Sequence, residues 1–225
     1  SSDLLAILNA DENQIGVDMI LRWLANGHEV AFCSQVSIIQ FNLFDNKFPL
    51  LTDFDAYIGT GSHYDTHQET EISWINSYKA WLKAFYFAGA SKLFSICFGH
   101  QMGGVALGGT VMLNKEGWGT GLREMKLDMP SKLGLPSSQN SIIIPAYHRY
   151  QVAVAPESAA LVATSPFCPN EILAYGKHML TMQTHPEKLT AKVQQEIADL
   201  NEHHQLTHKQ YQLAEKTLAR VNQGL

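Results

Sequence analysis

The sequence predicts one α/β domain with a small antiparallel addition. Its 225 residues, 45% of them hydrophobic, suffice for one large core but not for two well-separated domains of average size. Short apolar runs alternate with segments of helical periodicity in the first half of the chain, and strand-like segments then follow one another directly. No internal repeat or composition break marks a linker, so we expect a single domain over 1–225.

The first half of the chain contains the pattern of βα units. The apolar run Leu4–Ala10 reads as a strand, and apolar residues then recur at helical spacing until an Asn-Gly pair stops them. A later strand ends in the turn-prone sequence Gly-Thr-Gly-Ser. The predicted elements are strands at 4–10, 29–34, 55–59 and 92–96 and helices at 15–26 and 70–88.

The second half of the chain changes character. Short strand-like segments lie between turn residues from Thr110 to about Gln183, which indicates an antiparallel addition to the α/β core. Residues 189–222 return to helical periodicity with polar faces, so we expect a C-terminal helical segment there. The expected strands are 110–114, 122–129, 141–147, 152–156, 160–165, 171–176 and 178–184.

Charge and cysteine usage narrow the class of protein. The net charge is −5 with no basic run, so nucleic acid is not an expected partner. Cys33, Cys97 and Cys168 are odd in number and widely spaced, which suits a reducing compartment, and we expect a cytoplasmic protein. No apolar stretch approaches the roughly 18 residues of a membrane span. The sequence contains no phosphate-binding loop or metal-ligand cluster, so we expect neither cofactor nor metal.

The stretch "SICFGHQ" places Cys97 between a predicted buried strand and a helix of small residues. A sharp strand-to-helix turn would hold a nucleophile clear of both elements, and glycine beside it relieves crowding. The N-terminus of the helix would also favour the thiolate over the thiol. A buried structural cysteine explains the position equally well, because free cysteine packs as a small hydrophobe.

A second stretch, "MQTHPEK", could supply the base that a nucleophilic cysteine needs. His185 and Glu187 face the same side of an extended segment, so the carboxylate can orient the imidazole. Pro186 fixes the backbone angle φ between them. Taken alone, this stretch is also explained by a surface turn.

Together, "CFGHQ" and "QTHPE" on an alternating α/β background resemble the glutaminase domain of the class I, or triad, glutamine amidotransferases. The resemblance covers nearly the whole chain and implies an open, mostly parallel sheet flanked by helices, as in flavodoxin-like folds. It implies that Cys97 is the nucleophile and that His185 and Glu187 complete the triad. It also implies that the backbone N–H groups of Gly61 and Phe98 form the oxyanion hole.

The sequence departs from this family's pattern in two places. The family loop often reads Gly-Gly-Pro, whereas this chain has Gly-Thr-Gly-Ser at 59–62. A signature of the form His-x-Asp corresponds to "YHRYQV", where His148 matches and Tyr150 replaces the acid. We expect Gln101, His148, Arg149 and Tyr150 to contact the substrate. Arg149 could bind a carboxylate bidentately, although a solvated surface arginine is the alternative.

The resemblance implies hydrolysis of the γ-glutamyl amide bond of glutamine or of another γ-glutamyl compound through a thioester on Cys97. The stretches "EGWGTGLREMKL" and "GTGSHYDT" are similar to stand-alone relatives of the GMP synthase glutaminase, a group that includes plant γ-glutamyl peptidases. Three alternatives stay open: an ammonia-donating subunit of a separate synthase, a stand-alone γ-glutamyl peptidase, and a non-catalytic binding protein that retains the triad. The Arg149–Tyr150 pair could engage a leaving group larger than ammonia, which favours the stand-alone enzyme.

Overall fold

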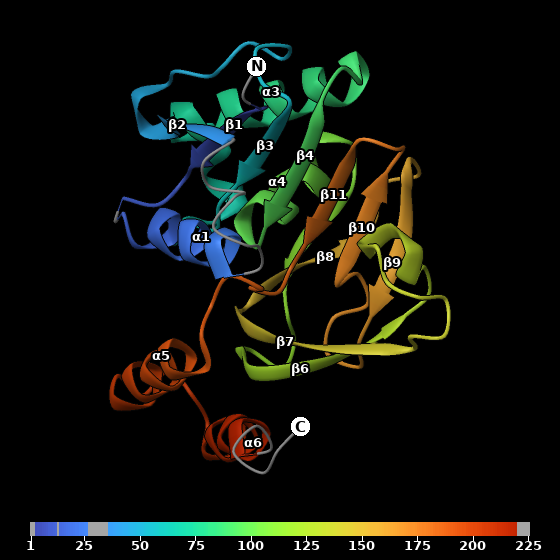
Figure 1. Ribbon diagram of the computed structural model, residues 1–225. Helices are drawn as coiled ribbons and strands as arrows, with labels where there is room; N and C mark the ends of the chain where they lie inside the picture. Colours follow the sequence, from blue (N-terminus) through green and yellow to red (C-terminus); the bar gives the residue numbers. More distant parts are fainter. Residues whose placement is uncertain (1–2, 13, 27–35, 220–225) are drawn as a thin grey trace.

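The computed structural model describes residues 3–12, 14–26 and 36–219, and its centre is one nine-stranded mixed sheet (Figure 1). The strand order is β2-β1-β3-β4-β11-β10-β9-β6-β7. The first five strands pair in parallel, and the remaining pairings are antiparallel. The sheet strands are β1 (Asp3–Asn9), β2 (Val36–Asn42), β3 (Ala56–Gly59), β4 (Lys92–Ile96), β6 (Gly119–Leu127), β7 (Ser141–His148), β9 (Ala159–Thr164), β10 (Ile172–Tyr175) and β11 (Met179–Met182).

Helices cover both faces of the parallel half, so the expected open, mostly parallel sheet flanked by helices is confirmed. Alternation along β1 explains the two layers, because Ala6 and Leu8 pack on one side while Leu5 and Ile7 pack on the other. In Figure 1, α1 lies in front of the sheet, whereas α3 and α4 lie behind it. The helices are α1 (Ile15–Asn26), α3 (Ser73–Ala88), α4 (Phe98–Ala106), α5 (Thr190–Glu202) and α6 (His208–Ala219), with short 3-10 turns η1 (Leu43–Asp45), η2 (Thr66–Thr70) and η3 (Pro130–Leu133).

The antiparallel half departs from the sequence prediction at one strand. The segment 178–184 was expected within the antiparallel addition, but β11 pairs in parallel with β4 and joins the parallel half. Hydrophobic alternation cannot identify a strand's neighbour, so this pairing was beyond the sequence pattern. A small separate antiparallel sheet is made by β5 (Thr110–Leu113) and β8 (Tyr150–Val154).

Two other predicted segments have different boundaries in the structure. The helix expected over 70–88 begins at Ser73, after η2. The single helical segment expected over 189–222 is two helices within its described part, because α5 ends at Glu202, α6 begins at His208, and His204 between them adopts a φ of 55°. The strand predicted at 29–34 and Cys33 lie outside the described residues.

The helix pair α5–α6 packs on the antiparallel end of the sheet, away from the other helices (Figure 1). Buried apolar residues of both helices meet Trp118, Leu122 and Tyr147. The backbone N–H of Leu122 also donates to Thr217 Oγ1 at 2.9 Å, which ties α6 to β6. No helix in the described ranges is both long and apolar enough to cross a membrane.

Candidate active site

The carboxyl ends of three neighbouring strands bring the predicted site residues together. In the sheet register, Ser95 of β4 pairs with Gly59 of β3, and Ile96 pairs with Met182 of β11. The chain therefore leaves the sheet at the same edge toward Cys97, toward the loop at 59–62 and toward the loop at 183–187. Ligands of open α/β sheets bind at this edge, outside the carboxyl ends of the strands.

Cys97 occupies a strained turn between β4 and α4. Its φ is 49° and its ψ is −101°, a backbone conformation that non-glycine residues rarely adopt. Its N–H donates to the Met182 carbonyl at 2.8 Å, and its carbonyl accepts from the N–H of Gln101 at 3.0 Å. The turn also needs a glycine after Phe98, because a Cβ on Gly99 would lie 3.0 Å from Ser95 Cβ. The strand-to-helix turn expected from the sequence is therefore present.

Two glutamine amides connect the sulfur of Cys97 to the neighbouring loop. Gln183 Nε2 donates to Cys97 Sγ at 3.7 Å, and the thiol lies 3.9 Å from the Tyr147 carbonyl. Gln101 Nε2 donates both to Gln183 Oε1 at 3.2 Å and to the Tyr150 carbonyl at 2.9 Å. Gln183 was not among the residues predicted from the sequence, and its place in "QTHPE" was the available signal.

His185 and Glu187 form a buried pair beside Cys97. His185 Nδ1 lies 2.7 Å from Glu187 Oε1, and the two residues are only 5% and 7% exposed. His185 Nε2 is buried and has no hydrogen-bond partner within the described part of the chain. Burial and Lys188 lower the pKa of His185, whereas Glu187 and Cys97 raise it by a larger amount. The net effect is an increase of the pKa from 6.5 to about 9. The imidazole is therefore held ready to carry a proton next to the sulfur.

The two residues expected in the oxyanion hole both lie next to Cys97. A Cβ on Gly61 would lie 3.2 Å from His185 Cε1 and 3.5 Å from Cys97 Cβ, so this glycine is close to both side chains. Phe98 is the first residue of α4, where backbone N–H groups have no intrahelical partner. Its ring is buried against Trp74 and Tyr78 at centroid distances of 5.8 and 6.5 Å.

The segment 147–150 forms one wall of the site. His148 is buried, its Nδ1 donates to the Tyr150 carbonyl at 3.0 Å, and burial together with Arg123 lowers its pKa to about 3. Arg149 Nη2 lies 3.7 Å from Asp65 Oδ2, and its guanidinium lies 5.5 Å from the Tyr150 ring centroid. Arg149 is thus partnered, although 47% of its side chain remains exposed.

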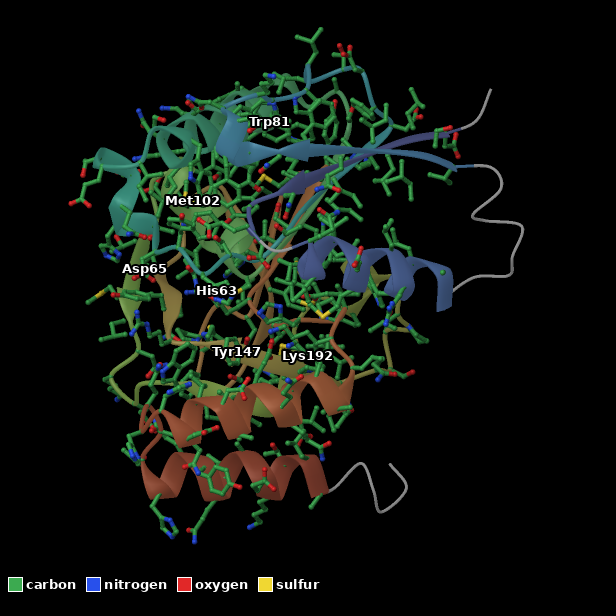
Figure 2. All side chains as sticks on the ribbon, turned by 90° about the vertical axis from the view of Figure 1, so that its left-hand side faces the viewer. His63, Asp65, Trp81, Met102, Tyr147 and Lys192 are labelled. Atoms are coloured by element: carbon green, nitrogen blue, oxygen red, sulfur yellow. The ribbon has the colours of Figure 1, made fainter. Side chains whose placement is uncertain are left out.

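Cys97 lies between two cavities of about 760 and 220 Å³. The larger one is lined by Gln101, His148, Arg149 and Tyr150, the residues expected to contact substrate, together with Asp65 and Trp118. The smaller one is lined by Gly61, His185 and Glu187 and by residues of α5. Tyr147 and His63 line both cavities. In Figure 2, Tyr147 lies between His63 and α5, the helix that carries Lys192.

Sequence reasoning predicted no site role for several other residues that line these cavities, among them Asp65, Tyr147 and Lys192. No spacing links Asp65 to Arg149 or Lys192 to His185, since packing of distant segments brings them together. Within the described residues, no group of three or more His, Cys, Asp and Glu side chains could hold a metal ion.

Comparisons with known proteins agree with this architecture. The family model for glutamine amidotransferase class-I matches residues 79–202. A protein of Arabidopsis thaliana named gamma-glutamyl peptidase 5 is 33% identical over 154 residues, which cover 65% of this chain and 60% of the relative. A Saccharomyces cerevisiae protein with "glutamine amidotransferase" in its name is 29% identical over 198 residues, or 81% of this chain and 78% of that one. The crystal structure of a glutamine amidotransferase from Thermotoga maritima superposes with a TM-score of 0.73 at 17% identity, covering 98% of this chain and 91% of that one.

Proposed function

Because the chain belongs to the class I glutamine amidotransferase family, we propose that it hydrolyses γ-glutamyl amide bonds through a thioester on Cys97. One observation carries this proposal. His185 is held by Glu187 through Nδ1, its buried Nε2 has no hydrogen-bond partner in the described residues, and His185 and Cys97 line the same cavity. This is the arrangement that a cysteine nucleophile needs from its base.

The residues divide the reaction between them as follows. The Cys97 thiol gives its proton to His185, and the thiolate attacks the γ-carbonyl carbon. The N–H groups of Gly61 and Phe98 stabilise the oxyanion. His185 then protonates the departing nitrogen as the C–N bond breaks, which leaves a γ-glutamyl thioester. Water, deprotonated by His185, cleaves the thioester and releases glutamate, while Glu187 stabilises the imidazolium in both halves.

The two cavities support one orientation of the substrate. The proton donor must reach the departing nitrogen, and His185 lines only the smaller cavity, so the amine leaves on that side. The γ-glutamyl chain then occupies the larger cavity. There Arg149 and Asp65 supply opposite charges that match an α-carboxylate and an α-ammonium group. This assignment moves Arg149 from the leaving group, where we expected it, to the glutamyl end of the substrate.

Of the three alternatives, we favour a stand-alone γ-glutamyl peptidase. This reading is supported by the two cavities beside Cys97, since described residues of this chain line both the one proposed for the acyl group and the one proposed for the amine. Relatives named as gamma-glutamyl peptidases support the same reading, although the chain covers only about three fifths of their length. A glutaminase subunit of a separate synthase is the second candidate, because relatives named as glutamine amidotransferases match as well.

The proposal is tested by glutamate release from glutamine, glutathione and γ-glutamyl dipeptides, using the purified chain. We expect turnover of at least one γ-glutamyl peptide with a higher kcat/KM than glutamine, and loss of turnover in Cys97→Ser with an unchanged circular dichroism spectrum. Turnover of glutamine alone, and only with an added synthase, would establish the subunit reading. Substrate binding without turnover in the parent chain would establish a binding protein.

A further inference from the structure

We propose that Lys192 binds a carboxylate on the departing amine, so that the smaller cavity selects γ-glutamyl amino acids and peptides over γ-glutamyl alkylamides. This inference rests on the proposed function and deepens it. It assigns a leaving-group subsite to one face of α5, a helix that contributes none of the reacting groups.

The smaller cavity is the binding site proposed for the departing amine, because the proton donor His185 lines it. Its lining includes His185 and Glu187 together with three residues of α5: Lys192, Glu196 and Asp199. Residues spaced by three or four share one face of a helix, so these three form a continuous wall. A group attached to the nitrogen that His185 protonates would extend toward this wall.

The charges of the cavity leave one lysine without an ion pair. Lys188 Nζ lies 2.8 Å from both carboxylate oxygens of Glu196 and 4.4 Å from the Tyr147 ring centroid, and its side chain is only 6% exposed. The Lys188 charge is therefore already neutralised by Glu196. Lys192 is half-buried and makes no ion pair with any residue in the described ranges. It is the side chain free to neutralise an incoming carboxylate.

The remaining acids of the cavity suit the other end of an amino acid. Asp11 and Asp199 also line the smaller cavity, and Asp11 Oδ1 lies 3.9 Å from His63 Nε2. The proton from His185 releases the nitrogen as a neutral amine, which takes a second proton from solvent and becomes an ammonium ion at neutral pH. Asp11 and Asp199 would lie near the ammonium group of a released α-amino acid, and Lys192 near its carboxylate. The charges of the cavity therefore complement both charged groups of the amino acid.

The test compares two substrates that differ by a single carboxylate. γ-Glutamyl-alanine and γ-glutamyl-ethylamide share the scissile bond and a two-carbon leaving group, but only alanine carries the acid. We expect the parent chain to have a kcat/KM at least about tenfold higher for γ-glutamyl-alanine. Lys192→Met should lower that value about tenfold and leave γ-glutamyl-ethylamide within about twofold. Lys209→Met is the matched control, because Lys209 is exposed on α6 and lines neither cavity.

Each outcome has a distinct meaning. An unchanged substrate ratio in Lys192→Met, or an equal loss on both substrates, would overturn the subsite while leaving γ-glutamyl hydrolysis intact. Equal kcat/KM values for the two substrates in the parent chain would do the same. Failure of the parent chain to cleave either substrate would overturn the proposed function as well. A restored preference in Lys192→Arg would support a charge-based role, since that variant keeps the cation.

Discussion

Gly61→Ala should reduce catalysis without reducing stability. The φ of Gly61 lies outside the positive region, so alanine fits the backbone without strain. An alanine Cβ would lie 3.2 Å from His185 Cε1, however, which is a few tenths of an ångström closer than an ordinary contact. The imidazole must therefore shift within a pair held at 2.7 Å from Glu187. The backbone N–H at this position is retained, so the substitution tests the placement of the base rather than the oxyanion hole.

The size of the effect follows from that displacement. A misplacement of about 1 Å can reduce catalysis about a hundredfold, so a shift of a few tenths should lower kcat/KM roughly tenfold. Replacing glycine at a position of compatible φ restricts the unfolded chain and adds about 0.4–1 kcal/mol to the free energy of unfolding, and the crowding of His185 offsets part or all of this gain. We therefore expect an unchanged or slightly higher Tm together with the kinetic loss.

Gly108→Ala is the matched control for this experiment. Gly108 has a φ of 96° and open space around its Cβ position, so alanine there strains the backbone without touching a neighbour. Gly108 also lines neither cavity beside Cys97. This variant should lose Tm and retain kcat/KM. The reasoning is refuted if Gly61→Ala keeps full activity, or if its activity falls only in proportion to a lost folded fraction.

Three further predictions concern other ionisable groups. A glutamine-analogue electrophile should label Cys97 and spare Cys168, because burial raises the pKa of the Cys168 thiol well above its usual value; mass spectrometry showing preferential labelling of Cys168 would contradict this. Glu187→Gln should lower kcat about a hundredfold or more without abolishing it, and His185→Ala should lower it further, while equal loss of folded protein in both would indicate a structural pair. Burial raises the pKa of Glu171 from 4.5 to about 7, so the folded chain binds this proton more tightly than the unfolded chain, and the free energy of unfolding should fall as pH rises from about 4.5 to 7. Denaturant titrations of Glu171→Gln should lack that part of the slope, and an identical pH dependence in both chains would refute the assignment.

The sequence predicted most of the strands and helices, because the hydrophobic periods are clear where one face of an element is buried. β1, by contrast, reads as a continuous apolar run because both of its faces are buried, with Ala6 and Leu8 on one side and Leu5 and Ile7 on the other. The neighbour of β11 was not predictable in the same way, since alternation gives the faces of a strand but not its partner. The break between α5 and α6 was missed because helical periodicity continues on both sides of it.

The residues of the candidate site also fall into those that the sequence could predict and those that it could not. Cys97, His185 and Glu187 stand in short motifs, so a resemblance carried by those motifs could point to them. Asp65 stands in the stretch "GTGSHYDT", but nothing in that stretch predicts its place beside Arg149, and Lys192 stands in no motif. Both reach the cavities through the packing of η2 and α5 against other parts of the chain. The residues expected for the shared chemistry were therefore visible in the sequence, while the lining proposed to select the leaving group was not.

The place of β11 between β4 and β10 has a consequence for how the site assembles. β4 and β11 are separated along the chain by every strand of the antiparallel half, yet their pairing sets Cys97 beside the loop that carries His185. Closing so long a loop is slow, because the entropy of the intervening chain is lost before the pairing stabilises it. Enzymatic activity should therefore return only with the last pairing of the sheet during refolding, after the helical signal has recovered. Cleavage of the chain within β6–β9 would place Cys97 and its base on two different fragments, even though neither residue is altered.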